Sequence, residues 1–284
     1  MTSRGFALAL FLPAFFALIL TTTAPLVYLA WTSAMRIELA MPWLSGLAGL
    51  DNYVKMGGDP RFWHSLALTA VYTATTVVLQ VVLGLSLALL VLRIPRGQGL
   101  LRVAAILPIV LAPVVVGLFW RTLVLSPDVG LVDVVTRALG LGSHNWLGDP
   151  DLALISVIAI HTWQWTPFAF LVILASLAAL PPDVFEAARI DRASAWRRFR
   201  HITLPLIRPA IVIVVIMRTM IALSAFAATG GGPGTATEIL NLYAYRTSFS
   251  EFNLGYGASL AMVLLAITLA VSFVMFRVRR RRWR

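Results

Sequence analysis

Residues 186–209 read EAARIDRASAWRRFRHITLPLIRP and differ sharply from the chain around them. Hydrophobic residues make up 60% of the 284-residue chain and charged residues only 12%. A soluble domain of this length carries roughly twice that share of charge. The arginines of the stretch are Arg189, Arg192, Arg197, Arg198, Arg200 and Arg208. The stretch is therefore a charged insert in a chain with the composition of a membrane protein.

Apolar runs long enough to cross a bilayer lie on both sides of the insert. A membrane-spanning helix needs about 20 predominantly apolar residues. The first run is too long for a signal-peptide core and no small-residue cleavage site follows it, so we expect it to remain as a span. The sequence predicts an all-α, polytopic membrane protein. Its six predicted spans are roughly 6–34, 63–92, 102–124, 153–180, 205–228 and 255–276.

The distribution of charge between the spans predicts an orientation. Cytoplasmic loops of membrane proteins carry an excess of Lys and Arg. Most of the 23 basic residues fall in four alternate segments, namely the N-terminus, 93–102, 181–208 and the tail from 277. Of the 12 acidic residues, only Asp183, Glu186 and Asp191 lie in these segments. We therefore expect a multi-pass protein of a bacterial cytoplasmic membrane with both termini in the cytoplasm.

Composition and motifs argue against several classes of function. The net charge is +11, but long uncharged runs separate the basic clusters, which favours contact with membrane lipid over nucleic-acid binding. Cysteine is absent, and there is no phosphate-binding GxxxxGK followed by Ser or Thr. The histidines lack the spacing of metal ligands; they are His64, His144, His161 and His201. We expect no catalytic residue, metal or cofactor in this chain.

The insert has the local features of a short helix pair. Asp183 is placed to cap the first helix, with Glu186 three residues later as in a capping box. Leu204–Pro205 is expected to end helical hydrogen bonding. Trp196 and Phe199 fall three residues apart on one helix face. These features fit a docking surface for a partner, a lipid-headgroup anchor, or a loop that packs on its own bundle.

The order of residues in the insert resembles a known element. The pattern EAA-x-x-D-x-A-x₈-I-x-L-P is similar to the EAA loop of ATP-binding-cassette importer permeases. The matching residues are Glu186, Ala187, Ala188, Asp191, Ala193, Ile202, Leu204 and Pro205. The resemblance implies that residues 181–205 are a coupling loop, seated in a groove of an ATPase subunit and passing its closure to the membrane helices. Arg192, Trp196 and Phe199 belong to the same loop.

Shorter motifs resemble one branch of that family, the carbohydrate importers of the maltose or glycerol-phosphate type. They are GLDNYV at 49–54, TGGGP at 229–233, YxY at 243–245 and LGYG at 254–257. The resemblance implies that residues 1–284 form a single permease domain with the type I importer fold, the first permease of a pair. It also implies a second homologous permease, two ATPase subunits that use ATP and Mg, and an extracytoplasmic solute-binding protein.

Two departures from the family pattern affect local shape. Arg192 stands where the family has glycine, and an arginine with positive φ would cost about 1 kcal/mol there. Either the turn is regular, or Arg192 makes a compensating contact. The stretch from Arg218 to TGGGP is also about one helical turn shorter than in the family, which moves the outer end of the span by about 5.4 Å.

Polar and aromatic residues at membrane depth are candidates for a substrate path. Sugar sites combine aromatic rings with a few polar groups. The candidates are Arg121, His161, Trp163, Gln164, Trp165 and Arg218. The alternatives are helix packing for the HTWQW group, bonds to the partner subunit for Arg218, and an interfacial position for Arg121. Tyr243 and Tyr245 suit a membrane-interface belt.

An arginine near the path favours an anionic sugar derivative, since guanidinium groups bind oxyanions well. Two other readings of the whole chain stay open. One is an importer permease for another solute, such as a polyamine, a phosphate or an amino acid. The other is a stand-alone membrane channel or enzyme, which would need no ATPase and no second permease.

Overall fold

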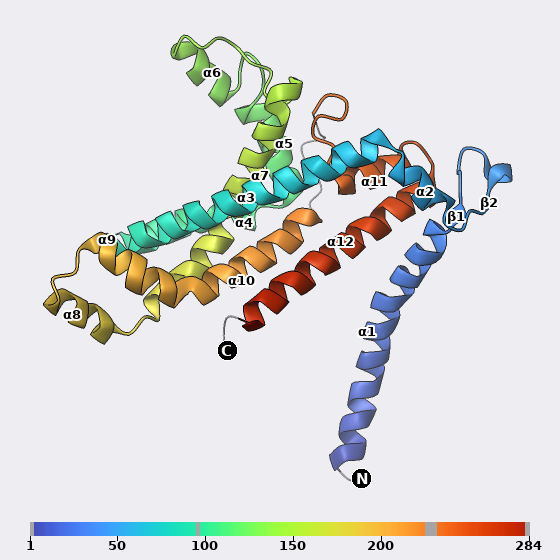
Figure 1. Cartoon of the computed structure of the whole chain (residues 1–284). Coiled ribbons are helices and arrows are strands. Elements are labelled where there is room, and N and C mark those ends of the chain that lie inside the picture. Colours follow the sequence, from blue (N-terminus) through green and yellow to red (C-terminus); the bar gives the residue numbers. More distant parts are fainter. Residues whose placement is uncertain (1–2, 95–96, 225–231, 282–284) are drawn as a thin grey trace. The chain divides into compact units, whose positions relative to one another are not determined.

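The computed structural model describes residues 3–94, 97–224 and 232–281, with side chains from residue 11 to residue 277 within those ranges. The described residues form helices and a small two-stranded sheet (Figure 1). In chain order they are α1 (Ser3–Ser33), β1 (Met35–Arg36), η1 (Pro42–Leu44), β2 (Gly46–Leu47), α2 (Asp51–Gly57), α3 (Pro60–Arg93), α4 (Gln98–Val110), α5 (Pro113–Phe119), η2 (Trp120–Val124), α6 (Leu131–Ala138), α7 (Pro150–Ala178), α8 (Pro182–Ile190), α9 (Ala195–Arg198), η3 (Phe199–Thr203), α10 (Leu204–Leu223), α11 (Leu240–Phe249) and α12 (Leu254–Arg281). The segments η2 and η3 are π-helical and η1 is a 3₁₀-helix.

Contacts divide the chain into two compact units. The first comprises Met1–Ser65 and Leu240–Leu269, and the second Leu66–Ile239 and Ala270–Arg284. In the first unit the motif GLDNYV has a structural role. The buried side chain of Asn52 donates hydrogen bonds to the carbonyl oxygens of Ser33 and Met35 at 2.9 and 3.0 Å, which fixes the end of α1 to the β1–β2 hairpin.

The second unit is centred on α7, which packs against α4 and α10. Its apolar core joins α3, α7 and α10, and Phe170, Ile173 and Ile207 are fully buried in it. The two ends of α7 carry different structures, since α6 precedes its first residue and α8 follows its last (Figure 1). The charged insert and the chain around α6 therefore lie at opposite ends of one long helix.

The predicted spans are found as helices. Among the described residues, five helices are long and apolar enough to cross a membrane, and the bent pair of α4 with α5 and η2 makes a sixth if it is counted as one span. The first, second, fourth and sixth spans lie close to their predicted limits. The fifth begins earlier than predicted, because α9, η3 and α10 run on as one span from Ala195 to Leu223.

The third predicted span, 102–124, is not a single helix. The two halves are bent by 98° between Val110 and Pro113. Proline disfavours helical geometry in the residue before it, and Ala112 is accordingly extended with ψ 138°. The break exposes the carbonyl of Leu111, and Gln164 of α7 donates a hydrogen bond to it at 3.3 Å. A polar residue of a neighbouring helix thus compensates the backbone group freed inside the bundle.

The close approach of α3 to α7 depends on a glycine. A Cβ on Gly84 would lie 2.7 Å from the Cβ of Ala169 and 2.8 Å from the backbone nitrogen of Phe170. Small residues allow helix backbones to approach in this way. We expect Gly84→Ala to destabilise the protein by about 1–3 kcal/mol, because the backbone of α7 must move aside.

The measurement is the thermal midpoint of the purified permease in detergent, compared with that of Gly99→Ala. A Cβ at Gly99 in α4 meets nothing within 4 Å, so this control adds helix propensity without a clash. Equal midpoints for the two variants would show that α3 and α7 do not touch at Gly84.

Candidate functional site

The charged insert folds as the expected pair of short helices, with different caps from those predicted. The first helix, α8, begins at Pro182, so Asp183 lies inside its first turn, and no side-chain cap is found for it among the described residues. The capping-box prediction for Asp183 and Glu186 is therefore wrong. Proline at the first helical positions sets the helical φ instead. The second helix, α9, is capped by Ser194, whose hydroxyl accepts a hydrogen bond from the backbone N–H of Arg197 at 3.3 Å.

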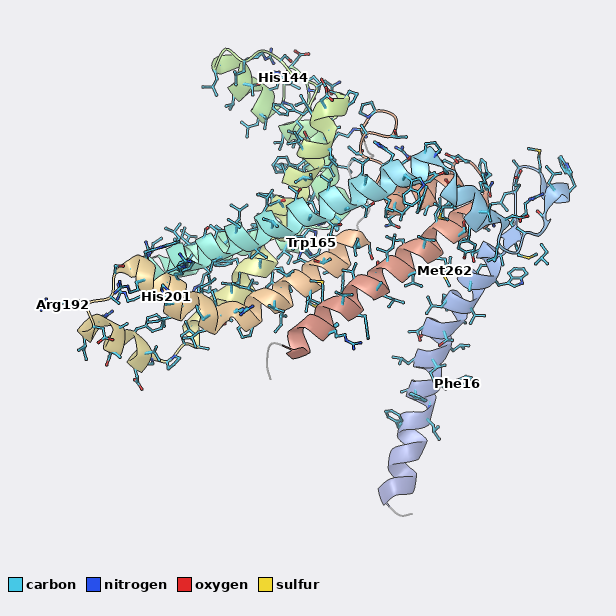
Figure 2. The ribbon with its side chains drawn as sticks, viewed as in Figure 1. Phe16, His144, Trp165, Arg192, His201 and Met262 are labelled. Carbon is cyan, nitrogen blue, oxygen red and sulfur yellow. The ribbon has the colours of Figure 1, made fainter. Side chains whose placement is uncertain are left out.

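The turn between α8 and α9 has the left-handed conformation that favours glycine. Arg192 has φ +51°, so the turn is not regular at this position. Two backbone hydrogen bonds hold it, from the N–H of Arg192 to Arg189 O and from the N–H of Ala193 to Ala188 O, both at 3.0 Å. The second closes a six-residue ring, as in a Schellman motif. Arg192 thus adopts a conformation that favours glycine, and Figure 2 shows it at the bend between the helices.

The aromatic pair of the insert consists of an exposed Trp196 and a half-buried Phe199. Trp196 is 67% exposed, and its ring centroid lies 5.6 Å from that of Phe199. A hollow of about 430 Å³ opens beside the pair, between the end of α3 and the helices α8 and α9. Its lining is mostly apolar and includes Leu89, Phe185 and Ala195. Two arginines, Arg93 and Arg198, complete the rim. The coupling segment, residues 181–205, therefore presents aromatic rings and positive charge together.

The coupling segment is continuous with the membrane helix that follows it. Leu204–Pro205 was expected to end the helix, and this prediction is wrong, because the π-helical segment η3 leads directly into α10. A π-turn alters the backbone register just before Pro205, whose missing N–H and ring would otherwise disturb an α-helix. The backbone from α9 through η3 to α10 is therefore continuously helical.

A second candidate site is a buried cluster around Arg218 of α10. Its side chain is fully buried. Arg218 donates from Nε to Gln80 Oε1 at 2.7 Å and from Nη2 to His161 Nε2 at 3.0 Å. The guanidinium carbon lies 4.5 Å from the ring centroid of Trp165, and the ring of Tyr72 lies 5.3 Å from that of His161. These five residues form the Arg218 cluster, which joins α3, α7 and α10.

The charge of Arg218 has only neutral partners within the described residues. His161 accepts at Nε2, so a neutral ring carries its proton on Nδ1. The Nη1 atom of Arg218 is buried and has no hydrogen-bond partner in the described part of the chain. Charged residues at membrane depth normally pair with one another or mark a functional site. The cluster therefore holds a cation with spare donor capacity for an anion.

The structure separates the other predicted path residues. His161 and Trp165 lie four residues apart on the face of α7 that meets Arg218, whereas Gln164 turns to Leu111 at the α4–α5 break. Trp163 packs edge-to-face on Trp120, with centroids 5.4 Å apart. Arg121 is exposed on η2. The HTWQW group is consequently not one pocket.

Sequence reasoning missed Gln80 and Tyr72, although Gln80 had a readable signal. It interrupts the apolar run TTVVLQVVLGL, and polar residues at membrane depth are rare unless they face a partner or cavity. Tyr72 lies two turns earlier on α3 and has no such signal, since tyrosine is common in membrane helices. Within its own chain, Arg218 is thus bonded to Gln80 and His161.

Tyr243 does not belong to an interface belt. It is 3% exposed, and its hydroxyl donates to Asp59 Oδ2 at 2.6 Å, as does the hydroxyl of Tyr256. Burial alone raises the pKa of Asp59, but these bonds and those from the backbone of Arg61 and Phe62 together lower the pKa below its usual value. The YxY and LGYG motifs thus meet at one carboxylate in the first unit.

Parts of other motifs lie outside the described residues. These parts are residues 229–231 of TGGGP, Arg96, Arg282 and Arg284, and the side chains of Arg4, Arg279, Arg280 and Arg281.

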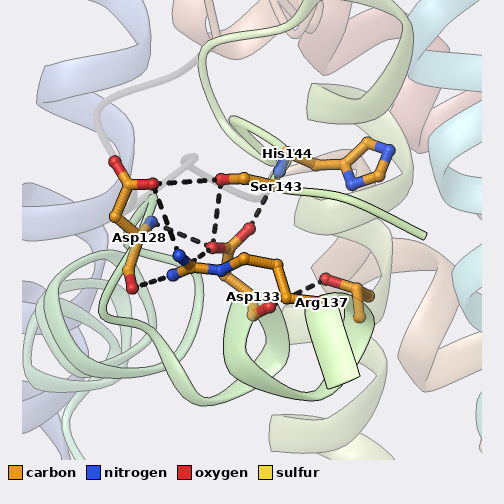
Figure 3. Close-up of polar contacts among 6 residues, drawn as sticks. Asp128, Asp133, Arg137, Ser143 and His144 are labelled. Atoms are coloured by element: carbon orange, nitrogen blue, oxygen red, sulfur yellow. Dashed lines mark hydrogen bonds and ion pairs between the residues drawn. The ribbon is translucent and has the colours of Figure 1, made fainter. Parts of the chain in front are cut away.

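Between η2 and α7 a hairpin, residues 125–149, is organised around a buried carboxylate (Figure 3). Asp133 accepts hydrogen bonds from the backbone N–H of His144 at 2.8 Å, from Ser143 Oγ at 3.0 Å and from the backbone N–H of Asp128 at 3.0 Å. Arg137 forms an ion pair with it at 2.9 Å. The His144 N–H contributes most to lowering the pKa of Asp133.

This network makes the stability of the hairpin depend on pH. Because the pKa of Asp133 is lower in the folded protein than the usual value of about 3.9, the ionised carboxylate stabilises the hairpin above that pH. The stabilisation is lost as pH falls through the folded pKa. We expect hydrogen–deuterium exchange of residues 125–149, corrected for intrinsic rates, to accelerate at acidic pH.

Asp133→Asn should already show fast exchange at pH 7, with little further change on acidification. The control is Asp151→Asn, an exposed aspartate in the first turn of α7. A hairpin in Asp133→Asn that exchanges as slowly as wild type at pH 7 would contradict a structural role for the network.

Comparison with known proteins finds relatives and similar folds for this chain. Over 259 residues it is 36% identical to the trehalose/maltose transport system permease protein MalF of Thermococcus litoralis, covering 89% of this chain and 86% of that protein. It is 34% identical to the sulfoquinovosyl glycerol transport system permease protein SmoG of Agrobacterium fabrum, covering 98% and 91%. The fold matches a chain in the crystal structure of a bacterial alginate ABC transporter in complex with an alginate pentasaccharide-bound periplasmic protein, with TM-score 0.85, 20% identity and coverage of 98% and 95%.

The family assignment follows from these matches and from a direct match to the family itself over residues 80–284. That range includes the coupling segment and the Arg218 cluster except Tyr72. The resemblance drawn from the EAA pattern is thereby confirmed, and so is the prediction of a type I ABC importer permease fold. The chain is a multi-pass membrane permease and belongs to the family of binding-protein-dependent transport system inner membrane components.

Proposed function

We propose that this chain is one of two permease subunits of an importer for a sugar or a sugar derivative, driven by two ATPase subunits that use ATP and Mg. Solute arrives on an extracytoplasmic binding protein, and the site opens alternately to the two sides of the membrane. The sugar class is supported by the relatives, which are named for trehalose, maltose and sulfoquinovosyl glycerol.

The observation that carries the proposal is the exposed surface of the coupling segment. Trp196 and Phe199 stand beside a hollow at the end of a segment that continues without a break into α10. Exposed aromatic side chains next to arginine are typical of the central residues of protein interfaces. An ATPase that binds here can move α10, and α10 carries Arg218. Packing on the chain's own bundle leaves this surface unexplained, since Trp196 stays 67% exposed.

The orientation follows from the same argument. An ATPase works in the cytoplasm, so the coupling segment lies on the cytoplasmic side. With an even number of spans, both termini lie on that side too, which agrees with the arginine distribution. The opposite end of α7, with the hairpin of residues 125–149, then lies on the extracytoplasmic side of the inner membrane.

The Arg218 cluster supports a solute with an acidic group. A guanidinium whose partners are neutral, and whose Nη1 is unpaired among the described residues, matches a sulfonate, carboxylate or phosphate, which accepts charge-assisted hydrogen bonds. His161 would contribute its Nδ1–H as a donor, and Trp165 an aromatic face, on the sugar side of such a solute. Trp163 and Gln164 contact Trp120 and Leu111 instead.

The experiment is reconstitution of the permease with its partner subunits in vesicles, with ATP enclosed. We expect ATP-dependent accumulation of a sugar that the binding protein delivers, competed by related sugars and not by polyamines, phosphate or amino acids. Uptake of one of those other solutes would assign the importer to that class. Accumulation without the ATPase subunits would point to a channel and overturn the proposal.

A further inference from the structure

The helix α6 buries an aspartate and exposes its apolar side chains, which is the opposite of the pattern of a helix on a water-exposed surface. Of its two charged side chains, Asp133 is fully buried, and Arg137, whose side chain is 41% exposed, turns back to bind Asp133 and the carbonyl of Asp128. Figure 3 shows these groups gathered on one side of the helix, with Ser143 and His144 closing the network. The polar face of α6 is therefore used within the hairpin.

The apolar face of the hairpin is turned outward. Its residues are 49% to 76% exposed and none of them carries a charge; they are Val129, Leu131, Val134, Val135, Leu139 and Leu141. Positions 131, 134 and 135 follow the spacing of one helix face. Soluble proteins bury such a stripe and expose the charges. This arrangement requires an apolar environment outside the hairpin.

The hairpin is attached closely to a membrane-spanning segment. Six residues separate Val124, the last residue of η2, from Leu131, and α6 packs on η2. The connection is tight, because a Cβ on Gly130 would lie 2.8 Å from the carbonyl oxygen of Val124. The neighbouring span exposes apolar side chains as well, including Leu118 and Leu123. The apolar face of α6 therefore begins where an apolar, membrane-crossing surface ends.

We propose that α6 is an interfacial helix whose apolar face lies in the lipid bilayer at the boundary between headgroups and acyl chains. Interfacial helices bury their apolar face about 5–10 Å into this boundary. The position of α6 favours lipid as the molecule that covers this face, because the hairpin is held within a few residues of a membrane span. The apolar face itself carries no charged group that a protein partner could bind. The Asp133 network satisfies the polar side of α6 internally, which lets the helix lie at the bilayer. The inference depends on family membership and not on the solute.

The chain contains no cysteine, so single labelling sites are available without background. A nitroxide is attached at Val134→Cys on the apolar face, and separately at Asn145→Cys, an exposed polar position of the same hairpin. The complete importer is reconstituted in vesicles of phosphatidylethanolamine and phosphatidylglycerol. Collision of each label with oxygen, which concentrates in lipid, is compared with collision with a water-soluble nickel chelate. Leu139→Cys supplies a second label on the apolar face if Val134→Cys does not assemble.

The label at residue 134 is expected to have an oxygen-to-nickel collision ratio several-fold higher than the label at residue 145. The ratio should not change when the solute-binding protein is added. Equal ratios would place the face in water and overturn the proposal. Low collision with both reagents would mean that a protein subunit covers the face, and protection that appears only with the binding protein would identify that protein as the occupant; either result overturns it.

Discussion

Trp196→Ala is expected to abolish ATP-driven uptake while leaving the permease inserted in the membrane. The side chain is 67% exposed and packs on Phe199, so its removal deletes most of the aromatic surface of the coupling segment without disturbing a core. Central aromatic residues of interfaces contribute about 2 kcal/mol or more, which corresponds to roughly a 30-fold loss of affinity. The measurements are co-purification of the ATPase subunits and stimulation of ATP hydrolysis by the loaded binding protein.

Two further variants make this result specific. Trp31→Ala removes an exposed indole from α1, outside the coupling segment, and should leave both readouts unchanged. Glu186→Lys reverses a charge on α8 and should also uncouple hydrolysis from uptake. If the loaded binding protein stimulated ATP hydrolysis normally in both Trp196→Ala and Glu186→Lys, the ATPase would not bind this surface.

Arg218→Gln is expected to cause the second large effect, a selective loss of transport for anionic sugars. Hydrogen bonds to charged groups contribute about 1.5–3 kcal/mol, so uptake of a sulfonated or phosphorylated sugar should fall by a factor on the order of 10 to 100. Uptake of a neutral competitor should fall much less. The comparison is made as initial rates in the same vesicles, with the amount of assembled complex measured in each preparation.

The control for Arg218→Gln must separate solute recognition from packing. Gln80→Leu removes one hydrogen-bond partner of Arg218 and keeps its charge. If the cluster acts only as a structural unit, both variants should impair assembly and reduce the transport of all solutes alike. If Arg218 receives the acidic group, Gln80→Leu should not discriminate between anionic and neutral sugars. Unchanged anionic uptake in Arg218→Gln would exclude the recognition role.

Features that depend on local pattern could be predicted from the sequence. The membrane spans could be predicted from the apolar runs, because a run of about 20 apolar residues is long enough to cross a bilayer as a helix. The spacing of Trp196 and Phe199 predicted a shared aromatic face, and the two rings are in contact, with Trp196 exposed and Phe199 half-buried. The family's glycine position left open whether the turn at Arg192 is regular or left-handed, and Arg192 takes the left-handed conformation.

Features that depend on contacts between distant residues could not be predicted in this way. The hydroxyl of Tyr243 reaches Asp59 across 184 positions of the chain, and nothing near either residue indicates the other. The HTWQW group looked like one pocket because its residues are adjacent, but helical rotation sends Trp163 and Trp165 to different neighbours. The break at Pro113 and the continuity through Pro205 show that the effect of a proline depends on the turns before it.

The central claim is that residues 181–205 bind an ATPase subunit. Ile190 is 83% exposed at the end of α8, and Ile190→Cys would be the sole cysteine of the chain. In the assembled importer, a short thiol-directed cross-linker at this position should join the permease to the ATPase, with a yield that changes between the nucleotide-free and ATP-bound states. Leu47→Cys, equally exposed on β2, should give no such product. A cross-link from Leu47→Cys and none from Ile190→Cys would contradict the account.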